Sequence, residues 1–233
     1  MTWDDMQPLL HDATIETLQM VGLATLVTVL LGLPLGVLLV LTGQGGLLRN
    51  RPVNKVVGAI VNIGRSLPFV ILLVALIPFT RWVVGTSIGW QAATVPLAVG
   101  AIPFFARLVE SAVRGVDGGL VEAVQAMGGS TWTVVRKALL PEALPALVSA
   151  LTTTVIALVG YSAMAGTVGG GGLGNLAITY GYMRFETGFM VVIVIELVVL
   201  VTLVQLIGDL VGRRLGHRGA AATGPLARLR RAA

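Results

Sequence analysis

The sequence predicts an all-α integral membrane protein with five transmembrane helices, and three observations support this fold class. Of the 233 residues, 55% are hydrophobic and only 12% are charged, about half the charged share of a typical soluble domain. Five stretches are apolar and long enough to cross a bilayer, which takes about 20 residues. Basic residues gather in alternate gaps between these stretches. So few charges cannot cover a soluble domain, and so much apolar surface excludes disorder.

The five spans follow the apolar stretches in chain order. We predict them at roughly 17–41, 63–83, 90–110, 142–165 and 187–212. Arg65 is expected to extend its guanidinium toward the membrane surface from one end of the second span. A glycine cluster after residue 165 ends the fourth span, and Glu196 lies inside the fifth.

The distribution of basic residues predicts the orientation. The first and third gaps and the C-terminal tail are rich in Arg and Lys, whereas the second and fourth gaps hold only Arg81 and Arg184. Because cytoplasmic loops carry the excess of basic residues, we expect the N-terminus outside and the C-terminus inside. The membrane domain is predicted over 1–216. The Ala/Gly/Arg-rich segment 217–233 is predicted to be a basic, disordered cytoplasmic tail.

The other charged and metal-ligating residues exclude several function classes. The formal net charge is +5, but the basic residues lie at the inner ends of spans, which does not suit nucleic-acid binding. The chain has no cysteine, so it can form neither disulfides nor thiolate metal sites. His11 and His217 are far apart in the sequence and have no neighbours at ligand spacing. We therefore expect no metal site.

The third gap, 111–141, is the longest predicted cytoplasmic loop and carries helical patterns of its own. Its first helix should begin at Asp117, which can serve as N-cap. The apolar residues at i, i+3, i+4 and i+7 are Leu120, Ala123, Val124 and Met127. Gly128 and Gly129 should end this helix with a sharp turn, since glycine readily takes positive φ.

A second short helix is predicted after the glycines, with Ser130 as its N-cap. Its apolar stripe consists of Trp132, Val135 and Leu139. Two interpretations remain open for the helix pair: it lies on the lipid surface as interfacial helices, or it offers a helix to the groove of a cytoplasmic partner.

The spacing in this loop resembles the EAA loop of ABC-importer permeases. That pattern is E-A-A, three residues, G, nine residues, I-x-L-P. The residues at the corresponding positions are Glu122, Ala123, Val124, Gly128, Leu140 and Pro141. The chain departs from the pattern at Val124 and at Ala138, which remain apolar. The resemblance implies that this loop is a coupling helix that docks on an ATPase subunit.

Further stretches resemble the methionine-importer permease subunits within that family. They are residues 65–78, 160–166, 169–174 and 180–185. The resemblance implies the type I importer fold and a location in the bacterial inner membrane. It also implies a two-fold homodimer, two cytoplasmic ATPase subunits that bind ATP and Mg²⁺, and an external substrate-binding lipoprotein. No cofactor is expected on this chain.

The fourth span carries a stripe of small and polar residues that could line a pathway for an amino acid. Its members are Thr153, Ala157, Gly160, Tyr161 and Met164. A thioether packs well against an aromatic edge, so the Tyr161–Met164 pair could contact a methionine side chain. The alternative is structural, because hydroxyls in membrane helices often bond to a carbonyl one turn back.

The glycine-rich run 169–174 is not a phosphate-binding loop. A Walker A motif requires G-x-x-x-x-G-K-[ST], and neither Lys55 nor Lys137 follows a glycine. We therefore expect the chain not to be an enzyme by itself. The run is predicted to form a tight turn with positive φ outside the membrane, and a direct substrate contact remains the alternative.

Three functions are compatible with these features. We favour the permease subunit of an ATP-driven amino-acid importer, with methionine indicated by the resemblance. The alternative is a proton- or sodium-coupled secondary transporter in which Glu196 is the coupling acid, since an acid inside a span suggests function. A scaffold without transport is the third. Five spans without repeats are too few for a secondary transporter unless the chain dimerises.

Overall fold

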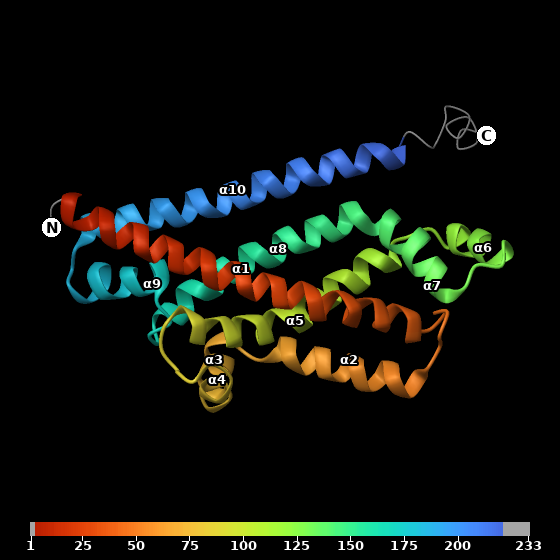
Figure 1. The fold of residues 1–233 in the computed structure, drawn as a ribbon, viewed down its shortest axis with the longest axis horizontal. Coiled ribbons are helices and arrows are strands. Elements are labelled where there is room, and N and C mark those ends of the chain that lie inside the picture. The colour runs from red at the N-terminus through yellow and green to blue at the C-terminus, as the bar shows by residue number, and fades with distance from the viewer. Residues whose placement is uncertain (1–2, 221–233) are drawn as a thin grey trace.

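The computed structural model describes residues 3–220, which form helices and turns without a β-strand. In chain order the elements are α1 (Trp3–Thr42), α2 (Arg51–Ser66), α3 (Phe69–Ala75), α4 (Ile77–Val84), α5 (Trp90–Arg114), α6 (Gly118–Ala126), α7 (Thr131–Val134), the π-helical turn η1 (Val135–Leu139), α8 (Leu140–Gly166), α9 (Gly172–Leu176), the π-helical η2 (Ala177–Met183) and α10 (Thr187–Ala220). Figure 1 shows the long helices side by side, with α6 and α7 at one end and α9 at the other.

Four helices among the described residues are long and apolar enough to cross a membrane. They are α1, α5, α10 and the continuous helix from Thr131 to Gly166 that joins α7, η1 and α8. The bent pair α2–α3 raises the number to five if it counts as one span. These helices confirm the predicted all-α membrane class, and the start of the fifth span at Thr187 is as expected.

The expectation of one continuous helix over 63–83 is wrong. Instead, α2 ends at Ser66, and α3 leaves it at an angle of 103°. The cause is Pro68, because a proline disfavours the helical conformation of the residue before it. Leu67 accordingly has an extended backbone, with φ −79° and ψ 127°. Arg65 therefore lies in the last turn of α2, not at the beginning of a span.

The core is centred on α5, which packs against α1, α2 and α8. In the half of the bundle near the N-terminus, Met20, Leu97 and Leu158 are fully buried together. In the half near α6, Val109 and Val134 are fully buried. By contrast, α10 buries few of its side chains, and its exposed apolar surface suits lipid or a second protein chain.

Local sequence signals form the loop at the α6 end as expected. The Asp117 carboxylate accepts a hydrogen bond from the Gly119 N–H at 2.8 Å, and the Ser130 hydroxyl accepts one from the Thr133 N–H at 3.3 Å. Both residues are thus the predicted N-caps. Gly128 has φ +78°, so the predicted positive-φ turn is confirmed.

The second loop helix is not a separate short element. From Thr131 it continues through η1 into α8. Pro141 explains the π-helical turn between them, since it has no N–H to donate to the carbonyl of Lys137, one α-helical turn earlier. After the Gly128 turn that follows α6, the chain therefore runs from Thr131 into the fourth span as one uninterrupted helix.

A packed helix follows the glycine run, where only a turn was expected. Gly169, Gly171 and Gly172 have positive φ, as predicted for the turn. The chain then forms α9 and η2, which lie against α1, α8 and α10. Side chains of α1 cap the start of α9: the Glu16 carboxylate accepts from the Gly172 N–H at 2.7 Å, and the Thr17 hydroxyl accepts from the Leu173 N–H at 2.9 Å.

The predicted cytoplasmic tail, 217–233, falls largely outside the described residues. The α10 backbone continues through Ala220. The predicted disorder beyond that residue stays a prediction.

The close packing of α9 on α8 yields a test of the fold. A Cβ at Gly174 would overlap the backbone of Ala163, and backbone cannot move aside cheaply. We expect Gly174→Ala to destabilise the protein by about 3 kcal/mol through overpacking. The measurement is thermal unfolding of the detergent-purified protein, followed by size-exclusion chromatography. The control is Gly22→Ala in α1, where a Cβ would meet nothing within 4 Å. Equal unfolding midpoints for the two variants would contradict the α8–α9 contact.

Candidate functional site

The first candidate site is the surface of α6, none of whose residues is buried. Leu120 is 38% exposed and Met127 is 79% exposed, and Glu122 and Ala123 are exposed beside them. We call these four residues the loop surface. It is apolar apart from one carboxylate and is uncovered within the described chain.

Two valines hold α6 against the rest of the protein. Val121 and Val124 are half-buried and pack on the cluster around Val134, Val135 and Leu139. Of the predicted stripe, Val124 therefore points inward, whereas Leu120, Ala123 and Met127 are exposed. One face of α6 therefore packs against the rest of the protein, and the opposite face is exposed.

The remaining predicted loop residues lie at the junction with α8. Leu140 is half-buried in the same cluster, and Pro141 is exposed at the start of α8. In the second predicted stripe, Val135 and Leu139 are buried, but Trp132 is 68% exposed. Of the predicted apolar stripe, Val135 and Leu139 thus pack inside the protein, and only Trp132 remains exposed to lipid or to a partner.

The second candidate site is the predicted stripe on α8. Thr153, Gly160 and Met164 are exposed, with Met164 at 45%, and Ala157 and Tyr161 are half-buried. None of the five residues is thus fully buried, although Tyr161 packs against the core cluster. The Thr153 hydroxyl donates to the Ser149 carbonyl one turn back, at 3.0 Å. For Thr153 the structural alternative, a hydroxyl bonded to the helix backbone, is therefore also met.

Two cavities flank the end of this stripe that is nearer α6, and Ser149 and Thr153 line both. One, of about 580 Å³, lies between α5 and α8 and includes Asp117 and Glu142. The other, of about 320 Å³, lies between α8 and α10 and includes Asp209. The α6 half of α8 therefore borders open, partly polar space on both sides.

Tyr161 contacts an aromatic residue that directly follows the break between α2 and α3. Its ring stacks on Phe69 at the start of α3, with centroids 4.7 Å apart and planes 11° from parallel. The turn at Pro68 thus places an aromatic ring against the predicted pathway residue. Sequence spacing alone gives no sign of this contact.

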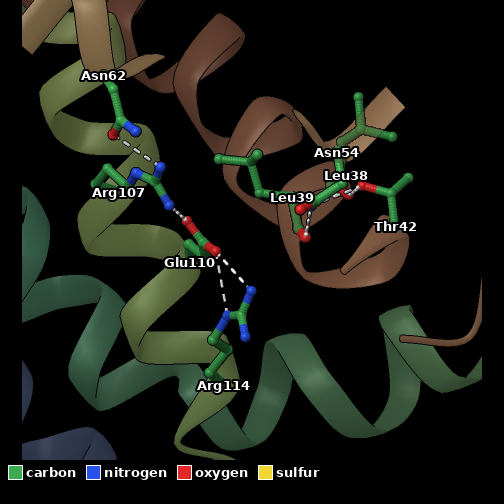
Figure 2. Close-up of polar contacts among 8 residues, drawn as sticks. All are labelled: Leu38, Leu39, Thr42, Asn54, Asn62, Arg107, Glu110 and Arg114. Carbon is green, nitrogen blue, oxygen red and sulfur yellow. Dashed lines mark hydrogen bonds and ion pairs between the residues drawn. The ribbon is translucent and has the colours of Figure 1, made fainter. Parts of the chain in front are cut away.

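A buried ion-pair cluster on α5 was missed by the sequence reasoning (Figure 2). Glu110 is buried, and its carboxylate pairs with the guanidiniums of Arg107 and Arg114, the latter at 2.8 Å. Arg107 also donates to the Asn62 side-chain oxygen at 2.8 Å, which links α5 to α2. The i, i+3, i+7 spacing of Arg107, Glu110 and Arg114 places them on one helix face, and this signal could have predicted the cluster.

A second polar contact in Figure 2 ties α2 to the end of α1. The Asn54 amide donates to the Leu39 carbonyl at 2.9 Å and to the Thr42 hydroxyl at 3.2 Å. Thr42 in turn donates to the Leu38 carbonyl at 2.7 Å. These bonds fix the direction in which α2 starts.

Glu196 has a partner on another span. Its carboxylate lies within hydrogen-bonding distance of the Thr14 hydroxyl of α1, whose single hydrogen is shared with the Leu10 carbonyl. The acid is half-buried between α1 and α10. Among the described residues, no group of three or more His, Asp or Glu side chains is arranged to hold a metal ion.

Comparison with known proteins gives consistent matches over most of the chain. A family model described as "Binding-protein-dependent transport system inner membrane component" matches residues 29–217. The probable D-methionine transport system permease protein MetI of Vibrio cholerae is 56% identical over 210 residues, which cover 90% of this chain and 93% of that protein. The methionine import system permease protein MetP of Bacillus subtilis is 46% identical, covering 90% and 94%.

Solved structures resemble the fold described above. A chain of the inward-facing methionine ABC transporter MetNI matches with a TM-score of 0.90 and 51% identity, covering 92% of this chain and 99% of that one. A chain of an amino acid ABC transporter crystallised with histidines matches with a TM-score of 0.73. At 22% identity, this second likeness concerns the fold alone.

The buried cluster on α5 generates a stability prediction. Glu110→Gln removes the charge that compensates Arg107 and Arg114. We expect a loss of about 2 kcal/mol, because a buried pair that loses one partner leaves an uncompensated charge, and water screens the partly exposed arginines. Thermal unfolding in detergent measures the loss, with Glu122→Gln on the exposed face of α6 as control. If Glu110→Gln unfolds at the same temperature as its control, the cluster does not stabilise the fold.

Proposed function

The chain belongs to the family of binding-protein-dependent transport system inner membrane components, and we propose that it is the permease subunit of an ATP-driven methionine importer. The observation that carries this proposal is the nearly full-length match to the methionine permeases, at 56% identity, together with the TM-score of 0.90 to MetNI. Its apolar helices suit a multi-pass protein of the inner membrane.

The loop surface of α6 is the site where an ATPase subunit docks. Its exposed apolar side chains, Leu120, Ala123 and Met127, lack a partner in the described chain, and an apolar helix face of this kind suits a hydrophobic groove. Glu122 lies in the second turn of α6 and is exposed beside these apolar residues, so its carboxylate is accessible to the partner. Gly128, in the turn after α6, sets the angle between α6 and the helix that follows.

The working assembly contains two copies of this chain, two ATPase subunits and an external substrate-binding lipoprotein. ATP and Mg²⁺ bind to the ATPase subunits, and this chain forms the membrane pathway and moves in response to them. The N-terminus and the α9 end face outward, and the α6 end and α10 terminus face the cytoplasm. The distribution of basic residues in the sequence supports this orientation.

The α8 stripe of Thr153, Ala157, Gly160, Tyr161 and Met164 lines the path of the amino acid. Thr153, Gly160 and Met164 are exposed in a single chain, as expected for residues that face a two-fold axis. When ATP draws the ATPase subunits together, each pulls on an α6. The helix that runs unbroken from Thr131 to Gly166 then carries this displacement to the stripe and opens the path outward.

The secondary-transporter hypothesis is not supported. The relatives and the matched structure are parts of ABC importers or binding-protein-dependent systems. Glu196 forms a hydrogen bond with Thr14, which gives it a structural role that joins α1 to α10.

The central test of the proposal is methionine uptake. The full complex, with its ATPase and binding protein, is reconstituted in proteoliposomes that contain ATP. We expect uptake of labelled methionine that requires ATP and the binding protein and persists when a protonophore and a sodium ionophore collapse the ion gradients. Uptake that follows a proton or sodium gradient without ATP would contradict it.

Coupling is tested at the turn after α6. Valine at position 128 cannot easily take φ +78°, whereas asparagine tolerates this region. We expect Gly128→Val to cost about 2 kcal/mol in local strain and to reduce ATPase co-purification or uptake, with Gly128→Asn affected much less. Glu122→Lys should act in the same direction through its reversed charge.

The readouts are co-purification of the ATPase and the ratio of methionine imported to ATP hydrolysed. Wild-type values for Gly128→Val and Glu122→Lys in both assays would show that this loop does not couple the two subunits.

A further inference from the structure

The broken second span leaves a cation, Arg65, partway along the length of the bundle, where it is exposed in the single chain. Arg65 lies fourteen positions after Arg51, where α2 begins, which corresponds to about 21 Å along the helix. A Cβ at the neighbouring Gly64 would lie 2.8 Å from the Pro103 ring, and Pro103 is near the middle of the 25-residue α5. Arg65, in the last turn of α2, is therefore near the mid-length of α5, whereas the sequence predicted it at the membrane-surface end of a span over 63–83.

Arg65 borders a cavity of about 250 Å³ between α2, α3, α5 and α8. The remaining lining residues are Gly64, Leu67, Phe69, Leu72, Gly100, Phe104 and Tyr161. The cavity thus combines one guanidinium with three aromatic side chains. No hydrogen bond or ion pair within residues 3–220 engages the Arg65 guanidinium. This contrasts with Arg107 and Arg114, which both pair with Glu110.

The charge at this depth requires a partner. An arginine inside a span is costly unless it faces water or pairs with an opposite charge, and a planar guanidinium matches a carboxylate in two parallel hydrogen bonds. The cavity also offers an acceptor for a cation. Pro68 has no N–H to donate to the carbonyl of Gly64, one turn earlier, and the C-terminal end of a helix favours positive charge.

We propose that this cavity is a transient binding site for a zwitterionic α-amino acid on its way through the membrane. Arg65 binds the carboxylate, and the carbonyls at the end of α2 face the ammonium group. The apolar side chain lies against Phe69, Phe104 and Tyr161, which suit a thioether. This inference rests on the proposed import function and extends it, because it assigns the charged contact to Arg65, a residue outside the α8 stripe.

The test uses the absence of cysteine from the chain, so that Arg65→Cys carries a unique thiol. The variant is reconstituted with an ATPase and a binding protein that lack accessible cysteines. We expect methionine uptake about tenfold below wild type, since a hydrogen-bonded charge is lost, with normal assembly. Reaction with 2-aminoethyl methanethiosulfonate, which attaches an ammonium group, should restore much of the uptake. The 2-sulfonatoethyl reagent, which attaches a negative charge, should not.

Ile60→Cys is the matched control, since Ile60 is 63% exposed on α2 and does not line the cavity. Neither reagent should change its uptake. Undiminished uptake by Arg65→Cys, or equal restoration by both reagents, would overturn the binding site while wild-type uptake keeps the proposed function intact. Failure of wild-type uptake under ATP would overturn both.

A second pair of variants covers the case in which Arg65→Cys does not assemble. Arg65→Lys keeps the charge and Arg65→Gln keeps only hydrogen-bonding ability. Uptake that is reduced about tenfold in Arg65→Gln and clearly less in Arg65→Lys, which keeps the charge but not the bidentate geometry, supports the site at equal ATPase co-purification. Equal uptake by the two variants contradicts it.

Discussion

In the hydrocarbon core of a bilayer no water can bond the backbone, so each N–H and C=O must find a partner within the protein. The long helices meet this requirement within themselves. The chain departs from it at the Leu67–Pro68 break and at the glycine turn before α9. At the turn, Glu16 and Thr17 accept the hydrogen bonds of Gly172 and Leu173. At the break, Gly64, Arg65 and Leu67 line an open cavity.

The same constraint explains where charges are tolerated inside the bundle. Glu110 is buried because Arg107 and Arg114 on its own helix face compensate it. Glu196 lies on α10 facing α1, where its carboxylate forms a hydrogen bond with the Thr14 hydroxyl. Both acids are thereby parts of the framework. Arg65 differs, since it borders a cavity and no partner within residues 3–220 engages it, and this leaves its guanidinium available to a ligand.

The α8 stripe and the cluster on which α6 packs belong to one continuous helix, Thr131–Gly166, whereas α6 itself precedes that helix and is separated from it by the Gly128 turn. Val121 and Val124 seat α6 on the cluster around η1, and η1 continues into α8. A force on the exposed face of α6 therefore reaches the α8 stripe through this packing. The π-helical turn at Val135–Leu139 lies between them, at the kind of position where such turns often accompany function.

The linear sequence determined the features that depend on composition and local chemistry. The apolar stretches predicted the membrane class, the Asp117 and Ser130 caps predicted where the loop helices begin, and Gly128 predicted the turn. The EAA-like spacing also marked α6, whose exposed surface the structure then revealed. Each of these signals acts within one or two helical turns, so a single sequence contains it.

Only the tertiary structure decided what depends on contacts between distant segments. In the tertiary structure the second span is bent at Pro68, Phe69 stacks on Tyr161, and α9 packs against α8. The tertiary structure also moved Arg65 from a predicted membrane surface to a cavity shared by four helices. Hydropathy cannot distinguish a straight apolar span from a bent one, because both must be equally apolar. The direction of a bend is settled only by the helices against which it packs.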